Sequence, residues 1–458
     1  MNEILSLSLT GIAIMIADIL NLKKAAVPLA LIGLATTIGL CVFDWNTDTV
    51  WYRMVKADNY ALAFTVVMCS TVLLWILMAD DYMARLKSST DRYALIMFTL
   101  VGAFCMVSFY NLVLLFIGIE ILSVSLYVLA GSNKTDLNSS EAAFKYFLMG
   151  AFASGFLLFG IALIYGLTGS FDIIDIRQTI GKIDLVANKG ILTIGILMIL
   201  IGMGFKISAA PFHFWAPDVY TGAPTPITAY MATVVKTAAM AALFRLFIIA
   251  FPQAMDIWLD VVVAMLVLSL LIGNVSAVLQ HDAKRMLAYS SISHVGYMLL
   301  AVLCTNSTTD NNLLFYTAAY SVATIVAFMV LYLVSQKKGS TGINAFDGLG
   351  KKNPLLAIAM TMALLSMAGI PPMAGFMAKY FIFANALGEG HFGLVLFAIC
   401  MSLVGVYYYF KIIIAMFFHE DTEGVPVKAD ILQNFLLIMG CALLILLGLM
   451  PNLVSGGL

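Results

Sequence analysis

Four ionisable side chains lie near the middle of hydrophobic stretches that are long enough to cross a lipid bilayer. They are Glu120, Lys206, Lys236 and Lys379. A charge at the centre of a membrane helix costs roughly 2.5 to 3.5 kcal/mol on insertion scales, so four such residues indicate a function that needs them there. Carboxylates and amines exchange protons, and a desolvated lysine loses its charge readily. The four residues therefore predict an ion path through the membrane.

Each of these residues also has a structural interpretation. Glu120 could be a protonated acid that hydrogen-bonds a neighbouring helix, and a lysine could extend its side chain to the membrane interface. Extension explains Lys236 poorly, because more than ten residues separate it from either end of its stretch. We expect Lys206 to be the partner of Glu120, since a nearby lysine stabilises a buried carboxylate.

A histidine adds a fifth candidate to the path. His294, in the segment YSSISHVGYML, could carry a proton near neutral pH, or it could be a neutral histidine bonded to Ser291 or Ser293. Lys411 and Arg245 lie closer to the ends of their stretches, and for them we expect an anchoring role.

The elements that position these residues are membrane helices. The chain is 62% apolar and only 11% charged, whereas soluble domains are about 25% charged. A bilayer core of about 30 Å needs about 20 apolar residues per helix, and the sequence offers fourteen such stretches. It predicts an all-α polytopic membrane protein without a separate soluble domain. The six cysteines lie singly, with no CxxC pattern, so we expect no metal ion or iron–sulfur cluster.

The spacing of the candidates indicates an internal repeat. Glu120 precedes Lys206 by 86 residues, and His294 precedes Lys379 by 85, so a polar position on span five and a lysine on span seven recur on spans ten and twelve. Each unit would contain five helices, and an odd number places the second unit upside down in the membrane. Inverted repeats are typical of ion-coupled transporters.

Spans seven and twelve, near residues 190–220 and 354–387, are predicted to be broken helices. A straight helix of about 34 residues would be about 51 Å long, well beyond the bilayer. Pro211 in one span and the pair Pro371 and Pro372 in the other remove backbone donors and disfavour helical geometry. Broken backbone at this depth is tolerated only beside a cavity or inside protein.

The predicted organisation has four parts, and the loop charges predict its orientation. Residues 1–90 form three N-terminal helices, 91–251 the first repeat (spans four to eight), 252–419 the inverted second repeat (spans nine to thirteen), and 420–458 the last helix. With the N-terminus outside, inner loops hold thirteen Lys and Arg residues and outer loops five, which favours both termini outside. Residues 171–186 mix isoleucines with charges, which is typical of an interfacial helix on the outer surface.

Four segments closely resemble the antiporter-like, proton-pumping membrane subunits of respiratory complex I. They are FIGIEILSVSLYVLAG, GFKISAAPFHFWAPDVYTGAPTPITAYMATVVK, KRMLAYSSISHVGYML and LLSMAGIPPMAGFMAKYF. The resemblance extends from about Tyr93 to Phe418, and it is greatest to the subunit N (ND two) branch. After PTP the chain lacks the histidine-containing stretch of subunits M and L, and span twelve carries a lysine where subunit M has a glutamate.

The resemblance implies a role for each candidate. Glu120 and Lys206 would be the coupled pair of the inlet half-channel, Lys236 the connecting lysine and Lys379 the outlet lysine. His294 corresponds to a family histidine on the central axis. The chain would be a translocase subunit of NADH:quinone oxidoreductase that couples quinone reduction to proton pumping.

The resemblance also implies partners and a location. NADH, FMN, iron–sulfur clusters and quinone would be bound by partner subunits, with no cofactor in this chain. Neighbours would be M-like and K-like subunits and the lateral helix of an L-like subunit, in the inner membrane of a bacterium. The chain would also interact with the lipid bilayer and with protons. We expect no nucleic acid among its partners.

Two other functions are compatible with the sequence. One is a subunit of a multi-chain sodium/proton antiporter or membrane-bound hydrogenase, which would share the fold. The other is a membrane scaffold in which the buried charges only bond helices together. In the scaffold, neutral substitutions would disturb assembly more than transport.

Overall fold

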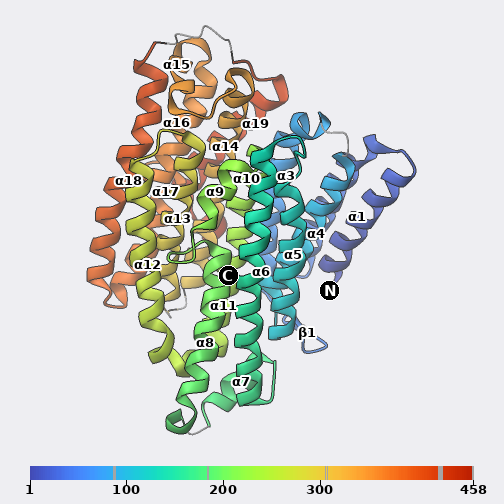
Figure 1. The fold of residues 1–458 in the computed structure, drawn as a ribbon, viewed down its shortest axis with the longest axis vertical. Coiled ribbons are helices and arrows are strands. Elements are labelled where there is room, and N and C mark those ends of the chain that lie inside the picture. The colour runs from blue at the N-terminus through green and yellow to red at the C-terminus, as the bar shows by residue number, and fades with distance from the viewer. Residues whose placement is uncertain (86–88, 183–184, 305, 307, 421–426, 456–458) are drawn as a thin grey trace.

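The protein is a bundle of long helices (Figure 1). The computed structural model describes residues 1–85, 89–182, 185–304, 306, 308–420 and 427–455. Twelve helical segments of the described chain are long and apolar enough to cross a membrane. Two further spans are the less apolar helix α13 (Ala283–Val302) and the divided span made by α16 (Pro354–Ala368) and α17 (Ala374–Gly388). The prediction of fourteen spans is confirmed.

The N-terminal part contains three spans and a small hairpin. The spans are α1 (Asn2–Ile19), α2 (Ala26–Phe43) and α3 (Asn59–Ala84), and a 3-10 turn (Lys23–Ala25) joins the first two. Strands β1 (Thr49–Trp51) and β2 (Val55–Ala57) pair antiparallel, with Thr49 opposite Ala57. This hairpin is the one departure from an all-α fold among the described residues, and the sequence did not predict it.

The first repeat follows the N-terminal part. Its elements are α4 (Ser89–Ser108), α5 (Leu112–Ala130), α6 (Leu137–Thr168), α7 (Ile173–Ile180), α8 (Leu185–Ile207), α9 (Trp215–Gly222), α10 (Thr225–Tyr230), a π-helical turn (Met231–Val235) and α11 (Lys236–Ala250). The predicted break in span seven lies between α8 and α9, around Pro211.

The second repeat has the same order of spans. A 3-10 turn (Pro252–Ala254) leads to α12 (Met255–Val278), α13, α14 (Thr309–Lys338), a 3-10 turn (Ile343–Phe346), α15 (Leu349–Lys352), α16, α17 and α18 (Phe392–Phe418). The break between α16 and α17 lies at the Pro371–Pro372 pair. The chain ends with α19 (Ile431–Leu449) and α20 (Asn452–Ser455).

The two repeats share their local signals as well as their order. Asn111 accepts from the amide of Val113 in the first turn of α5, and Asp282 accepts from the amide of Arg285 in the first turn of α13. Such caps contribute about 1 kcal/mol each. Both capping residues also form an isolated β-bridge, Asn111 with Asp172 and Asp282 with Gly342. Figure 1 shows α7, which follows α6, at the lower end of the molecule and α15, which follows α14, at the upper end. The second repeat is therefore inverted.

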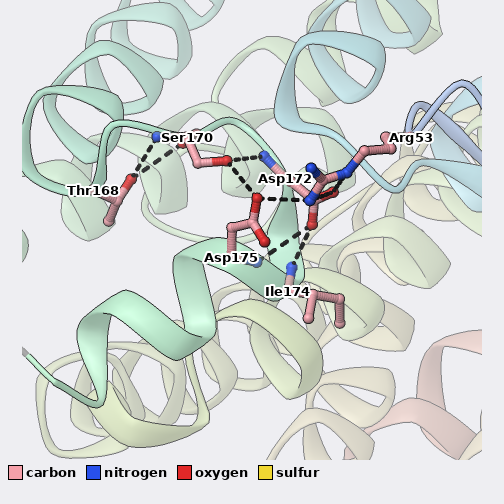
Figure 2. Close-up of polar contacts among 6 residues, drawn as sticks. All are labelled: Arg53, Thr168, Ser170, Asp172, Ile174 and Asp175. Carbon is pink, nitrogen blue, oxygen red and sulfur yellow. Dashed lines mark hydrogen bonds and ion pairs between the residues drawn. The ribbon is translucent and has the colours of Figure 1, made fainter.

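The short helix α7 lies where the sequence predicts an interfacial helix, but its apolar face is covered by protein. Ile173, Ile176 and Ile180 are buried, and α7 packs on α11. Figure 2 shows its opposite, polar side, where Arg53 from the hairpin forms ion pairs with Asp172 (3.0 Å) and Asp175 (2.7 Å). Covering the isoleucines and pairing the charges ties α7 to the bundle.

The centre of the bundle is formed by α11, α13 and α14. Nearly every residue of these helices is buried, and 94% of the most apolar window of α14 lies inside the protein. A helix that is buried on all sides cannot be recognised by an apolar stripe, which agrees with the even hydrophobicity of these segments. The candidate residues Lys236 and His294 lie on these central helices.

Candidate proton path

Lys206 lies in the last turn of α8, where span seven breaks. Its ammonium donates a 2.6 Å hydrogen bond to Ser123 Oγ of α5 and lies 5.7 Å from the centre of the Tyr146 ring of α6. The residue is 3% exposed. The groups that contact the ammonium directly are therefore a neutral hydroxyl and the π face of a ring.

Glu120 lies on α5 one turn before Ser123, and it accepts a hydrogen bond from Ser154 of α6. The expected direct ion pair between Glu120 and Lys206 is not formed, because each is held by its own serine. Ser123 faces the interior, whereas Glu120 lies on the partly exposed side of α5. A small cavity beside Lys206 is lined in part by Ser123 and Ser154, the two serines that bond Lys206 and Glu120.

Lys236 begins α11, directly after the π-helical turn Met231–Val235. It donates to both oxygens of Ser291 on α13, the hydroxyl at 2.8 Å and the backbone carbonyl at 2.9 Å. The Tyr220 ring centre lies 5.7 Å from the ammonium, and the residue is 1% exposed. Single π-helical turns inside membrane helices are frequent at functional sites.

His294 of α13 is buried and bonded through both ring nitrogens. Nδ1 lies 2.8 Å from the Tyr316 hydroxyl and Nε2 lies 3.2 Å from the Tyr409 hydroxyl. The alternative of a bond to Ser291 or Ser293 is not formed, because Ser291 holds Lys236 and Ser293 donates to its own helix. A neutral imidazole donates from one nitrogen and accepts at the other, so this tyrosine–histidine–tyrosine chain can reverse its direction.

Lys379 lies in α17, just after the second break. It donates to Ser402 Oγ of α18 at 2.7 Å and to the carbonyl of Ala368 at 2.9 Å. The Tyr297 ring centre lies 4.6 Å away. Gly369, with φ of +84°, makes room for the lysine, because a Cβ there would lie 2.9 Å from Lys379 Cδ.

The broken helices help to hold both lysines. Lys206 is in the last turn of α8, and Lys379 bonds Ala368, the last residue of α16. The C-terminal end of a helix carries partial negative charge from its unpaired carbonyls. Each break therefore supplies a dipole for an ammonium group without a carboxylate beside it, although Lys206 precedes its break and Lys379 follows its own.

Helix α13 connects Lys236 to Lys379. On α13, Ser291 holds Lys236, His294 lies one turn further along, and Tyr297 lies under Lys379. Residues three apart share one side of a helix. A second small cavity is lined in part by His294, Tyr316 and Tyr320. The structure thus brings Lys236, His294 and Lys379 to one buried strip.

The sequence did not identify the hydroxyl groups that complete this strip. Ser123 comes from α5, Tyr316 from α14, and Ser402 and Tyr409 from α18, and polar residues of these types are common in membrane helices. A weak signal existed for Ser123, which lies three residues after Glu120 on the same helix. Nothing in the sequence marked the other three, because their contacts with the lysines and with His294 depend on which helices pack together.

Arg245 is not an interfacial anchor, contrary to expectation. It is 2% exposed and forms a two-pronged ion pair with Asp58, at 3.0 and 2.9 Å, and donates to the carbonyl of Val107. Asp58 also caps α3. An arginine stays protonated in proteins, so this pair joins α11 to α3 and is separate from the lysines.

The sequence matches the family profile described as NADH:quinone oxidoreductase/Mrp antiporter, TM, over residues 110–405. A relative named NADH-quinone oxidoreductase subunit N, from Cytophaga hutchinsonii, is 41% identical over 457 residues, covering 99% of this chain and 98% of the relative. Such identity over the full length indicates a common family.

Solved structures show the same fold. A chain in the structure of respiratory complex I from Thermus thermophilus with bound aureothin is 33% identical, with a TM-score of 0.84 and coverage of 99% of this chain and 98% of that one. A chain of the Mrp complex from Dietzia reaches a TM-score of 0.87 at 19% identity, covering 99% of this chain and 96% of that chain, which shows the fold alone. The chain therefore belongs to the NADH:quinone oxidoreductase/Mrp antiporter transmembrane family and, within it, to the NADH-quinone oxidoreductase subunit N proteins.

Proposed function

We propose that this protein carries protons across the membrane as a subunit of an NADH-quinone oxidoreductase. The observation that supports this most directly is the set of three buried lysines, Lys206, Lys236 and Lys379, each held by neutral oxygens. Burying an ammonium without a counter-ion costs several kcal/mol. The charge of each lysine is therefore sensitive to a charge change nearby, as a proton relay requires.

The relay begins at the first repeat, residues 91–251. A change in the neighbouring subunits brings Glu120 and Lys206 together. In this structure the two groups are apart, which corresponds to the separated state of the pair. Formation of the pair stabilises the charged form of Lys206, and its separation favours release of the proton toward Lys236.

The relay ends in the second repeat, residues 252–419. Lys236 and His294 are joined through α13, and His294 exchanges a proton with the hydroxyls of Tyr316 and Tyr409. Lys379 then releases the proton to the outer side. The hydroxyl groups of Tyr146, beside Lys206, and Tyr297, beside Lys379, are buried without a hydrogen-bond partner among the described residues. They are free to bond to a transferring group.

The redox chemistry belongs to partner subunits in this proposal. NADH, FMN, the iron–sulfur clusters and quinone are assigned to other chains of the complex. Glu120 shares one face of α5 with Val124 and Val128, which are exposed. A neighbouring membrane-arm subunit of the M-like or K-like type, or the lateral helix of an L-like subunit, would cover this face and act on Glu120.

We assign the chain to a bacterial inner membrane with both termini outside. The distribution of thirteen inner and five outer basic loop residues supports this orientation, and an even number of spans returns the chain to its starting side. The Arg53–Asp172 pair then lies on the outer surface.

The test is NADH-driven proton pumping in membrane vesicles, with assembly of the complex followed on native gels. Lys206→Ala and Lys379→Ala are each expected to abolish most of the pumping while the complex assembles. Lys411→Ala is the matched control, because Lys411 is also on a membrane helix but bonds the end of α12 at Val278, away from the strip.

Undiminished pumping by assembled Lys206→Ala and Lys379→Ala complexes would assign these lysines to structural roles. Failure of assembly in both variants, with normal assembly of Lys411→Ala, would favour the scaffold. Vesicles that show no NADH-driven proton pumping but exchange Na⁺ for H⁺ would favour the antiporter.

A further inference from the structure

The short helix α9 supports two of the buried lysines at once. Its first residue, Trp215, stacks on Tyr146 with ring centres 4.6 Å apart, and the Tyr146 ring lies under Lys206. Its sixth residue, Tyr220, lies under Lys236. Trp215 and Tyr220 also contact each other edge to face at 5.7 Å. The position of α9 therefore sets the aromatic surroundings of both Lys206 and Lys236.

Helix α9 cannot hold this position by itself. It has eight residues and follows the irregular segment 208–214. An isolated helix shorter than about 12 residues is unstable in water, since nucleation costs more than so few hydrogen bonds return. Its place is therefore decided by the helices around it.

A cluster of charges on the inner side fixes α9 to both repeats. Asp218 of α9 pairs with Lys145 of α6 at 3.1 Å through one oxygen and with Arg285 of α13 at 3.1 Å through the other. Lys284 of α13 donates to the carbonyls of Thr221, at 2.9 Å, and Ala223 at the end of α9. We call Asp218, Lys145, Lys284 and Arg285 the α9 clamp.

The clamp lies at an open cavity, so it is accessible to change. A cavity of about 250 Å³ is lined in part by Glu141, Lys145, Asp218 and Arg285, whose side chains are all partly or fully exposed. On α9 the aromatic side chains are buried and Asp218 is not. The helix thus carries both buried aromatic side chains beside the lysines and a partly exposed carboxylate in the clamp.

We propose that Asp218 is a positioning residue for proton transfer between Lys206 and Lys236, acting by holding α9 between α6 and α13. This inference rests on the proposed function. The clamp joins the first repeat, through Lys145, to α13, which carries Ser291 and His294 of the second. Loss of the carboxylate charge frees α9 and separates the aromatic contacts of the two lysines.

The test uses the assembled complex in its membrane, with Asp218→Asn. Two quantities are measured: hydrogen exchange of the amides of residues 215–222, and protons pumped per NADH oxidised. The exchange rate is expected to rise about two- to five-fold, which corresponds to the loss of a partly exposed ion pair. The proton ratio is expected to fall toward that of Lys206→Ala. Asp218→Glu, which keeps the charge, should restore both.

Glu141→Gln is the matched control. Glu141 pairs with the same Lys145, at 2.7 Å, but lies on α6 and does not bond α9. Its loss removes one carboxylate from the same cavity and should leave both quantities unchanged. If Asp218→Asn fails to assemble, Arg285→Gln tests the other arm of the clamp, with Arg285→Lys as its charge-conserving partner.

Normal α9 exchange in Asp218→Asn would overturn the proposal, and so would faster exchange with an unchanged proton ratio. Lys206→Ala, measured alongside, separates the two hypotheses. If it keeps the wild-type proton ratio, the proposed function fails, while the exchange data still report on the clamp.

Discussion

At the scale of single residues, this protein handles buried positive charge in two ways. Lys206, Lys236 and Lys379 are held by serine hydroxyls and backbone carbonyls, whereas Arg245 is paired with a carboxylate, Asp58. The first arrangement leaves the charge state open to change, and the second fixes it. The difference separates the groups that we propose to move protons from the one that holds helices together.

The Arg245–Asp58 pair is expected to be essential for stability. Asp58→Asn leaves a buried guanidinium with reduced compensation and should lower the free energy of unfolding by about 3 to 5 kcal/mol. Thermal unfolding of the detergent-purified chain would measure this. Asp48→Asn is the control, since Asp48 forms an exposed pair with Lys56 at 3.3 Å and its loss should cost less than about 1 kcal/mol. Equal effects of the two variants would contradict the assignment.

The same pair predicts a dependence of stability on acid. Burial raises the pKa of the Asp58 carboxyl, but the charge and hydrogen bonds of Arg245 and the amide of Ala61 outweigh burial and hold the pKa below 3.8. A carboxyl with a lowered pKa contributes stability above its unfolded pKa and loses it as the pH falls through the folded value. The melting temperature should therefore fall below about pH 3.8, more steeply than in Asp58→Asn. Parallel pH profiles of the two proteins would refute this.

At the scale of elements, the two breaks matter most. Proline removes a backbone donor and ends the helix. At the second break, the carbonyl of Ala368 at the end of α16 accepts a hydrogen bond from Lys379. Gly369 lies against Lys379 at the second break. Its positive φ is favoured by glycine, and its lack of a Cβ leaves the space that the lysine side chain occupies.

Replacing this glycine should displace the lysine. Gly369→Ala places a Cβ 2.9 Å from Lys379 Cδ and strains a backbone with φ of +84°. Proton pumping per NADH should fall at least several-fold. Gly339→Ala is the control, since Gly339 has a similar φ of +68° but nothing within 4 Å of the added Cβ. It carries the strain without the contact, so pumping should stay near the wild-type value. A similar loss in both variants would attribute the effect to strain alone.

At the scale of the whole molecule, the three N-terminal helices are attached to the first repeat from one side. Asp58 reaches Arg245 of α11, the Tyr60 hydroxyl donates to the carbonyl of Ala241, and Arg53 pairs with Asp172 and Asp175. Only the Arg53 contacts are exposed. The buried contacts therefore carry the attachment, while the exposed cluster in Figure 2 orders the hairpin.

Removing the exposed cluster should loosen the hairpin without affecting transport. Arg53→Gln is expected to speed hydrogen exchange of residues 49–57 and to leave NADH-driven pumping unchanged, because exposed ion pairs contribute little and are screened by salt. The wild-type hairpin should approach the variant's exchange rate as salt is raised. A loss of pumping in this variant would show that the outer cluster takes part in transport.

The sequence by itself determined the number of spans, the two breaks, the inverted repeat and the five candidates for the path. These follow from local physics: bilayer thickness sets helix length, proline ends a helix, and charge in hydrocarbon is too costly to be accidental. The repeat was predicted from the spacing of Glu120, Lys206, His294 and Lys379, because the distance between residues along the sequence can be read without the structure.

Only the tertiary structure decided which groups touch. In the structure, Glu120 and Lys206 do not form a direct ion pair. Ser291 bonds Lys236 and not His294, and Arg245 forms a buried ion pair with Asp58 instead of lying at the interface. The structure also placed Lys284 at the end of α9, where its ammonium donates to the carbonyls of Thr221 and Ala223. These outcomes depend on how helices rotate and pack, and helices buried on all sides carry no apolar stripe to fix that rotation from the sequence.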